Sequence, residues 1–268
     1  MTNESPFPRT IVGVDGSPPS RAALRWAAAR AAPDGAPLVL AYVASPEDES
    51  GVGDTLLADA ASLVRSEHPE LAVEELPLVG AAWRELSRAA GADDRLVIGT
   101  HKTGLAHGRV TGSLALRLAL ATRAEFVVVP DLDLRFRRGV VAGIGGAGTA
   151  GPVALAAAAE ARRMRAPLTL VHGSCPRRCD DALDAAERAV TGDPERAGDA
   201  PTITRRSLSS PAADALLDAA LDKQLLVLGA GGRGRAAGAA PIGALTHDVL
   251  MNANAPILLL APAPPQQA

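Results

Sequence analysis

The sequence predicts an α/β fold made of two tandem five-stranded parallel-sheet modules. Hydrophobic residues make up 47% of the 268 residues and aromatic residues only 2%, so we expect a core of Ala, Val and Leu. The apolar runs are short and continuous rather than alternating, which is typical of parallel strands buried on both faces. The third observation is an internal repeat, which divides the chain into two copies.

The repeat has an offset of 130 residues, which grows to 131 near the end of each copy. Three apolar segments return: residues 37–40 as 167–170, residues 96–99 as 226–229, and residues 126–129 as 257–260. A duplication sets domain boundaries without any appeal to linker composition. We therefore expect one module over residues 1–132 and a second over residues 133–268, each long enough to bury its own core.

The elements of the first copy follow from apolar runs that are separated by helical stretches. In chain order they are strand Thr10–Val14, helix Ser20–Ala32, strand Leu38–Val43, helix Gly53–Ser66, strand Ala72–Leu78, helix Ala81–Ala90, strand Leu96–Ile98, helix Ser113–Ala121 and strand Phe126–Val129. Right-handed crossovers make such a sheet doubly wound and Rossmann-like. A ligand then binds at the carboxyl ends of the strands, near the point where the strand order reverses.

The charge of the chain is small, with a formal net charge of −3 and a sequence pI near 6.0. No large basic field results, which argues against nucleic acid or an anionic membrane as a partner. No apolar stretch approaches the roughly 20 residues that a membrane helix needs. We therefore expect a cytoplasmic protein with soluble partners.

Asp15 follows the first strand directly and precedes Gly16 and Ser17. Its carboxylate is expected in a strand-to-helix turn at the ligand-binding edge of the sheet, where it can accept hydrogen bonds. A purely local role is the alternative, because Asp, Gly and Ser are favoured in such turns without any ligand.

A glycine-containing loop runs from Gly99, at the end of the fourth strand, to Gly112 and Ser113 at the start of a helix. Glycines let the backbone approach a phosphate, and the free N–H groups of Gly112, Ser113 and Leu114 would point at it. As an ordinary N-cap, Ser113 would need no ligand. Because this loop and Asp15 converge on one edge, the pattern favours a nucleotide-phosphate site.

These motifs resemble those of the universal stress protein family in its tandem form, and the resemblance covers nearly the whole chain. In that family the first strand ends in an Asp that contacts the nucleoside, which Asp15 matches. The family's phosphate motif is Gly, two residues, Gly, nine residues, then Gly-Ser or Gly-Thr; Gly99 and Gly112-Ser113 match it, while Lys102 replaces the second Gly. Lys102 either contacts phosphate through its ammonium group or fills the space that the missing glycine leaves.

The resemblance implies an adenine nucleotide alpha hydrolase-like fold that binds ATP or a related adenine nucleotide in the first module. Backbone groups at the end of the second strand, here Val43, would contribute to the site. The output would be a regulatory stress response, with slow ATP hydrolysis at most and no metal. The resemblance also implies that the two modules pair with each other within the chain and that two chains form a homodimer. The alternative is a nucleotide-independent adaptor that acts through protein contacts, with both pockets degenerate.

The second copy departs from this pattern, because Gly145 replaces the Asp and Ala244 replaces the Ser. Without the carboxylate and the hydroxyl, we expect this copy to bind nucleotide weakly or not at all. Its glycine strings, residues 143–148 and 229–234, imitate a dinucleotide-binding fingerprint. The first lacks the acidic residue about 20 positions on, and the second lacks the helix that should follow directly.

A metal site in the second copy is the remaining alternative. His172, Cys175 and Cys179 lie close together in the sequence and are soft ligands. No fourth ligand is evident nearby, so we expect two reduced thiols at a strand-to-helix junction.

Overall fold

The structure is a computed structural model, and it describes residues 9–48, 51–101, 112–173, 179–192, 199–229 and 243–260. The chain divides into two units, Met1–Asp131 and Leu132–Ala268. The expected boundary, after residue 132, lies one residue further along.

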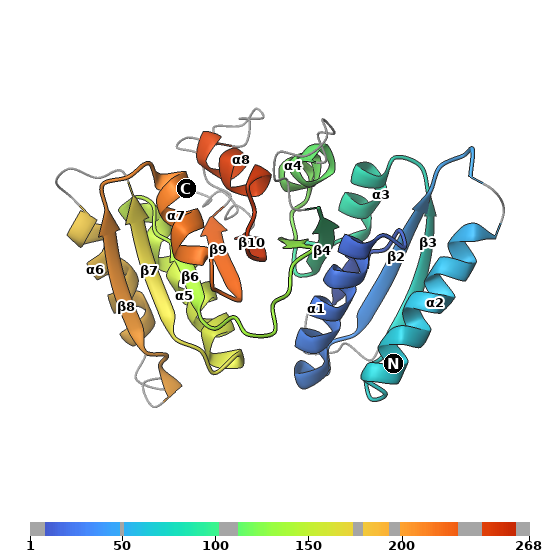
Figure 1. The fold of residues 1–268 in the computed structure, drawn as a ribbon, viewed down its shortest axis with the longest axis horizontal. Helices are drawn as coiled ribbons and strands as arrows, with labels where there is room; N and C mark the ends of the chain where they lie inside the picture. Colours follow the sequence, from blue (N-terminus) through green and yellow to red (C-terminus); the bar gives the residue numbers. More distant parts are fainter. Residues whose placement is uncertain are drawn as a thin grey trace, which may run out of the picture. The chain divides into compact units, whose positions relative to one another are not determined.

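The first unit alternates strands with helices (Figure 1). Its elements are β1 (Thr10–Gly13), α1 (Pro18–Asp34), β2 (Leu38–Ala44), α2 (Val52–Glu67), β3 (Val73–Val79), α3 (Ala82–Ala89), β4 (Arg95–Thr100), α4 (Gly112–Ala121) and β5 (Glu125–Pro130). The strands pair in parallel in the order β3-β2-β1-β4-β5, so the order reverses between β1 and β4.

The second unit repeats this order. Its elements are β6 (Val140–Gly143), α5 (Ala147–Arg163), β7 (Leu168–Gly173), α6 (Cys179–Thr191), β8 (Ile203–Leu208), α7 (Ala212–Ala220), β9 (Leu225–Gly229), α8 (Ala244–Met251) and β10 (Ile257–Leu260). Its parallel sheet has the order β8-β7-β6-β9-β10. The register repeats as well, because Gly13 pairs with Ala41 and Gly143 pairs with Val171. The predicted α/β fold of two tandem modules is confirmed.

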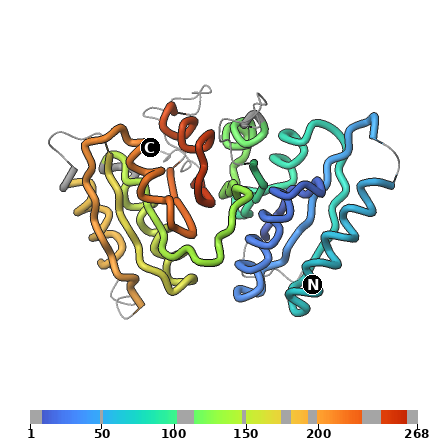
Figure 2. The backbone as a smooth tube through the Cα atoms, in the orientation of Figure 1, coloured from blue at the N-terminus to red at the C-terminus, as the bar shows by residue number. Residues whose placement is uncertain are grey.

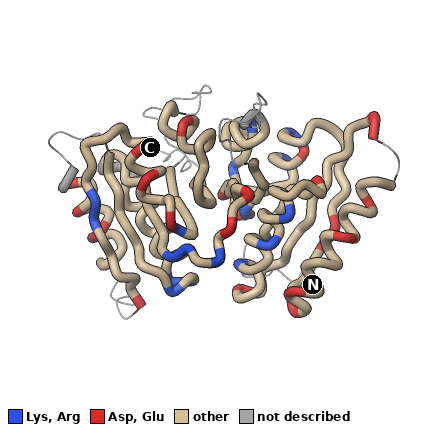
Figure 3. The backbone as a smooth tube through the Cα atoms, viewed as in Figure 1, with Lys and Arg blue, Asp and Glu red and all other residues tan. Residues whose placement is uncertain are grey.

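Helices cover both faces of each sheet, as the backbone trace in Figure 2 shows. In the first unit α1 packs with α2 and α3 packs with α4; in the second α5 packs with α6 and α7 with α8. The central strands are buried from both sides: Ile11, Val12, Val140 and Val141 are fully inaccessible to solvent. Charged residues lie mainly on helices and loops (Figure 3). The outer strands β3 and β8 also carry charged residues, which discourage pairing with another chain. Arg95 and Glu125, the first residues of β4 and β5, form an ion pair at 2.8 Å.

The first helix is longer than expected at both ends, for local reasons. It begins at Pro18 rather than Ser20, because proline is tolerated in a first turn and the Ser17 hydroxyl accepts the Ser20 N–H at 3.3 Å. It ends at Asp34 because Gly35 adopts a φ of 62° and donates its N–H to the last turn.

Of the helices that the structure describes, none has the length and apolar character needed to cross a bilayer.

Candidate functional site

A cavity of about 110 Å³ opens at the carboxyl edge of the first sheet, beside the point where the strand order reverses. The ends of β1, β2 and β4 form it together with the start of α1 and residues of α3 and α4. Four residues that the sequence predicts as nucleotide ligands lie around this one cavity: Asp15, Val43, Gly99 and Leu114. They come from four separate segments of the chain, and folding brings them together at the edge where ligands bind in doubly wound sheets.

The other predicted ligands lie at or beyond the limit of the described residues. Gly112 and Ser113 are the first residues of α4, directly before Leu114. Their positions in the helix agree with the predicted helix start, and their side chains are outside the described part. Lys102 lies outside the described residues altogether.

Asp15 is exposed at the mouth of the cavity, in a tightly bonded turn. Its Oδ1 accepts the N–H of Ser17 at 2.9 Å, and its own N–H donates to the Ser20 hydroxyl at 3.1 Å. Gly16, between them, has a φ of 76°, a conformation that favours glycine. Within the described part of the chain Oδ2 accepts no hydrogen bond, so one oxygen builds the turn and the other is available to a ligand.

Gly99 has a structural role that is independent of any ligand. A Cβ atom at this position would lie 2.2 Å from the backbone carbon and oxygen of Pro19. The first turn of α1 therefore packs directly on the end of β4, and only glycine leaves room for it. The packing of Pro19 therefore requires a glycine at position 99, whether or not this glycine also belongs to a phosphate-binding motif.

Tyr42 is a lining residue that the sequence analysis did not single out. Its ring lies against Gly53, where a Cβ would come within 2.6 Å of Tyr42 Cδ1. Its hydroxyl donates to Asp48 Oδ2 at 3.3 Å. Burial, and then the negative charges of Asp48 and Asp15, raise the pKa of Tyr42 above its ordinary value. Its position directly before Val43 is the sequence signal that points to it.

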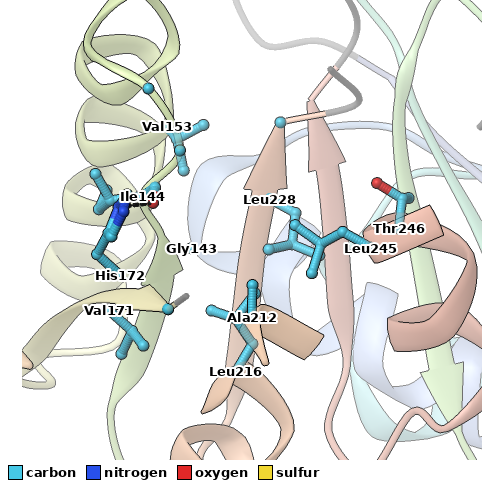
Figure 4. A pocket seen from close by; sticks show the side chains of 14 residues that line it. Gly143, Ile144, Val153, Val171, His172, Ala212, Leu216, Leu228, Leu245 and Thr246 are labelled. Atoms are coloured by element: carbon cyan, nitrogen blue, oxygen red, sulfur yellow. Dashed lines mark hydrogen bonds between the residues drawn. The ribbon is translucent and has the colours of Figure 1, made fainter. Parts of the chain in front are cut away.

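The second unit has a cavity of about 180 Å³ at the matching edge (Figure 4). The repeat offset pairs its residues with those of the first cavity: Gly145 stands for Asp15, and His172 stands for Tyr42. The side chains around it are mainly aliphatic. Among the described residues that line it there is no Asp, Glu, Lys or Arg.

His172 is held in place by the backbone. Its Nδ1 lies 2.7 Å from the carbonyl oxygen of Ile144, and because a carbonyl only accepts, Nδ1 is the donor. The turn after β6 is also shorter than the turn after β1: three residues, Ile144 to Gly146, precede α5, whereas four, Val14 to Ser17, precede α1. The two copies therefore differ in backbone as well as side chains at this edge.

No cluster of three or more His, Cys, Asp or Glu with the geometry of a metal site occurs in the described ranges. The alternative of a site at His172, Cys175 and Cys179 falls partly outside them, because Cys175 and the side chain of Cys179 are not described.

The fold and the two cavities define a class: tandem doubly wound α/β modules, each with a cavity where the strand order reverses. The model of the universal stress protein family matches the chain twice, over residues 6–130 and 137–261. The chain belongs to the universal stress protein family.

Solved structures agree with this fold. A universal stress protein from Archaeoglobus fulgidus DSM 4304 is similar over 94% of this chain and 97% of its own, with a TM-score of 0.67 and 14% identity. A protein of unknown function from Pseudomonas aeruginosa PAO1 is similar over 96% of this chain and 94% of its own, with a TM-score of 0.63 and 15% identity. A universal stress protein in complex with cAMP is similar over 47% of this chain and 98% of its own, with a TM-score of 0.40 and 25% identity. No curated protein sequence matches the chain.

Proposed function

We propose that the first unit binds ATP or a related adenine nucleotide and that the output of binding is regulatory rather than catalytic. The observation that supports this most directly is the position of Asp15 at the mouth of a cavity beside the strand-order reversal. Its Oδ2 would accept hydrogen bonds from the nucleoside. Backbone groups of Val43 and Gly99 would line the same site.

The size of the cavity limits how much of the nucleotide it encloses. An apolar cavity of about 150 Å³ takes up benzene, so a cavity of about 110 Å³ surrounds only part of a nucleoside. The phosphates would lie outside it, along the start of α4. There the N–H groups of Gly112, Ser113 and Leu114 would face the anion, and Lys102 belongs to the sequence segment that leads to this helix.

Calorimetric titration of the full chain with ATP tests the proposal. We expect about one nucleotide per chain, because the second unit lacks the carboxylate. A hydrogen bond to a charged group contributes about 1.5–3 kcal/mol, so Asp15→Asn should weaken binding roughly tenfold or more. Asp54→Asn is the matched control, since Asp54 is an exposed carboxylate on α2 that does not line the cavity.

Two results would reject parts of this proposal. Equal affinities for Asp15→Asn and the parent would remove the role of Asp15. A stoichiometry near two would show that the second unit also binds nucleotide. No side chain is proposed as a catalyst, so phosphate release from ATP should stay close to the rate in buffer.

A nucleotide-independent adaptor is the second candidate, and two contacts favour it. Asp15 already caps a turn through Ser17, and Gly99 is already required by the packing of Pro19. Both residues therefore have structural roles that need no nucleotide. Absence of any ATP binding by the parent chain would favour the adaptor. A cytoplasmic location, pairing of the two units and a homodimer stay predictions.

A further inference from the structure

We propose that the cavity of the second unit is a binding site for a small, uncharged, largely apolar molecule. This site is chemically distinct from the nucleotide site of the first unit and does not depend on that site. Its walls, polarity, rim and size each point to the same class of ligand.

The walls are closely packed. Leu216 of α7, Leu228 of β9 and Val153 of α5 border the cavity and are almost completely buried (Figure 4). A Cβ on Gly143, at the base, would lie 2.4 Å from Leu228 Cδ2 and 3.1 Å from Leu216 Cδ2. Because the base is this tight, the space above it is a formed cavity rather than loose packing.

The described side chains that line the cavity favour an uncharged ligand. Only His172 and Thr246 contribute polar side chains among the described lining residues, and Nδ1 of His172 is already bonded to Ile144. A phosphate or carboxylate brought into this space would lose water without gaining an ionic partner from the described side chains, which is costly. Leu245, at the rim, is 38% exposed, so a bound apolar molecule would bury surface that water now contacts.

The rim of the cavity includes Gly146. Neither the backbone conformation nor the packing at this position requires a glycine. Gly146 has φ −67° and ψ 162°, values open to any residue, and a Cβ there would meet no atom within 4 Å. The aligned Gly16 of the first unit differs on both counts: its φ is 76°, and a Cβ would lie 2.8 Å from Leu56. A side chain at position 146 would therefore occupy the mouth of the cavity without disturbing the fold.

The volume of about 180 Å³ sets the size of the ligand. An apolar cavity of about 150 Å³ holds one benzene molecule, so this space suits a single aromatic ring with a small substituent. Benzyl alcohol is a suitable probe, and benzoate is its charged counterpart of nearly the same shape.

Methyl NMR of the full chain, labelled at Ile, Leu and Val, tests the proposal because both units contain reporters. Benzyl alcohol should cause saturable shifts at Ile144, Leu216 and Leu228 and leave Leu86 and Ile98 of the first cavity unchanged. Benzoate should bind at least tenfold more weakly. Absence of saturable shifts in the second unit, equal shifts in both units, or benzoate binding as tightly as the alcohol would each overturn the proposal.

A filled-rim variant, Gly146→Leu, gives a second test. It should weaken benzyl alcohol binding at least tenfold, with Gly146→Ala intermediate. Gly151→Ala is the control, because Gly151 lies on the same helix outside the cavity and its Cβ would make an ordinary 3.8 Å contact with Ala189. The methyl spectrum of each variant reports whether the second unit is folded. Unchanged affinity in folded Gly146→Leu or Gly146→Ala would overturn the proposal. ATP titration of the same variants keeps this test separate from the function proposed for the first unit.

Discussion

The two carboxyl-edge cavities occupy the same place in two copies of one sheet, yet the described polar side chains that line them differ. The first has a carboxylate, two serine hydroxyls and a phenol around about 110 Å³. The second has mainly aliphatic side chains and glycines around about 180 Å³. The strands beneath them keep the same order and register.

This comparison separates two kinds of constraint. The buried strands must keep close packing, so their apolar character repeats in both copies. The turns that follow the strands face solvent, and a change there costs the core little. Residues 15 and 145 can therefore differ while the sheet stays the same, and the cavity of each unit has its own set of lining side chains.

The largest expected effect, on the free energy of unfolding, concerns two glycines at strand ends, one in each unit, that differ in their surroundings. Gly99→Ala places a Cβ 2.2 Å from the Pro19 backbone, which has no room to move, whereas Gly143→Ala meets the ends of the Leu216 and Leu228 side chains. We expect a loss of about 3 kcal/mol for Gly99→Ala and about 1 kcal/mol for Gly143→Ala.

Hydrogen exchange measured separately on β4 and β9 checks this pair of glycine variants. Exchange should accelerate strongly in the first unit of Gly99→Ala and weakly in the second unit of Gly143→Ala. Equal small losses for the two variants would show that α1 can shift away from β4.

A smaller effect is expected at an ion pair that only the first unit has. Asp94, which is 8% exposed, accepts from Arg9 Nη2 at 2.8 Å and from the Gly91 N–H at 2.8 Å, while the aligned position in the second unit is Gln224. Because Arg9 is half exposed, we expect Asp94→Asn to destabilise the first unit by about 1–2 kcal/mol at neutral pH. Asp93→Asn, at an exposed neighbour, is the control and should have almost no effect.

The pH dependence of this pair has a definite sign. Burial acts to raise the pKa of Asp94, but hydrogen bonds from Arg9 and Gly91 outweigh it and hold the pKa below the ordinary 3.8. The carboxylate therefore stabilises the folded state fully above that value and loses its contribution as the pH falls through the lower, folded-state pKa. Urea unfolding of the parent and Asp94→Asn should differ at neutral pH and converge in acid. A constant difference at all pH values would contradict this assignment.

The smallest effect concerns Tyr42, which the second unit replaces with His172. Tyr42 is the single tyrosine of the chain, so phenolate absorbance reports on it alone. We expect its pKa above the ordinary 10.0, because burial and the nearby Asp48 disfavour the phenolate. Asp48→Asn should lower the pKa of Tyr42 toward its ordinary value, because the nearby negative charge is removed, while Asp54→Asn should leave it unchanged. A parent pKa at or below the ordinary value would show that the ring is not held against Gly53.

Much of the fold could be predicted because it depends on local patterns. The buried strands of the first copy lie within two residues of their predicted ends, and α1 extends further only because of Ser17 and Gly35. The placement of Asp15 at the carboxyl edge also followed from topology, since the carboxyl ends of parallel strands share one edge.

The site was less predictable, because a pattern does not distinguish a ligand-binding glycine from one that packing requires. Gly99 matched a phosphate motif, yet its contact with Pro19 depends on where α1 lies against β4. Tyr42 belonged to no motif, and His172 was considered only as a possible metal ligand beside two cysteines. Their relevance depends on the cavities beside them, which are formed by segments far apart in the chain.

The sequence by itself determined that the chain is a duplicated parallel α/β module with an acidic turn in one copy and a glycine turn in the other. Those features are encoded in neighbouring residues and in the offset of 130. Only the tertiary structure decided that the glycine turn opens onto the larger cavity. A cavity is the volume left between side chains from several strands and helices, and no local pattern specifies the distances between them.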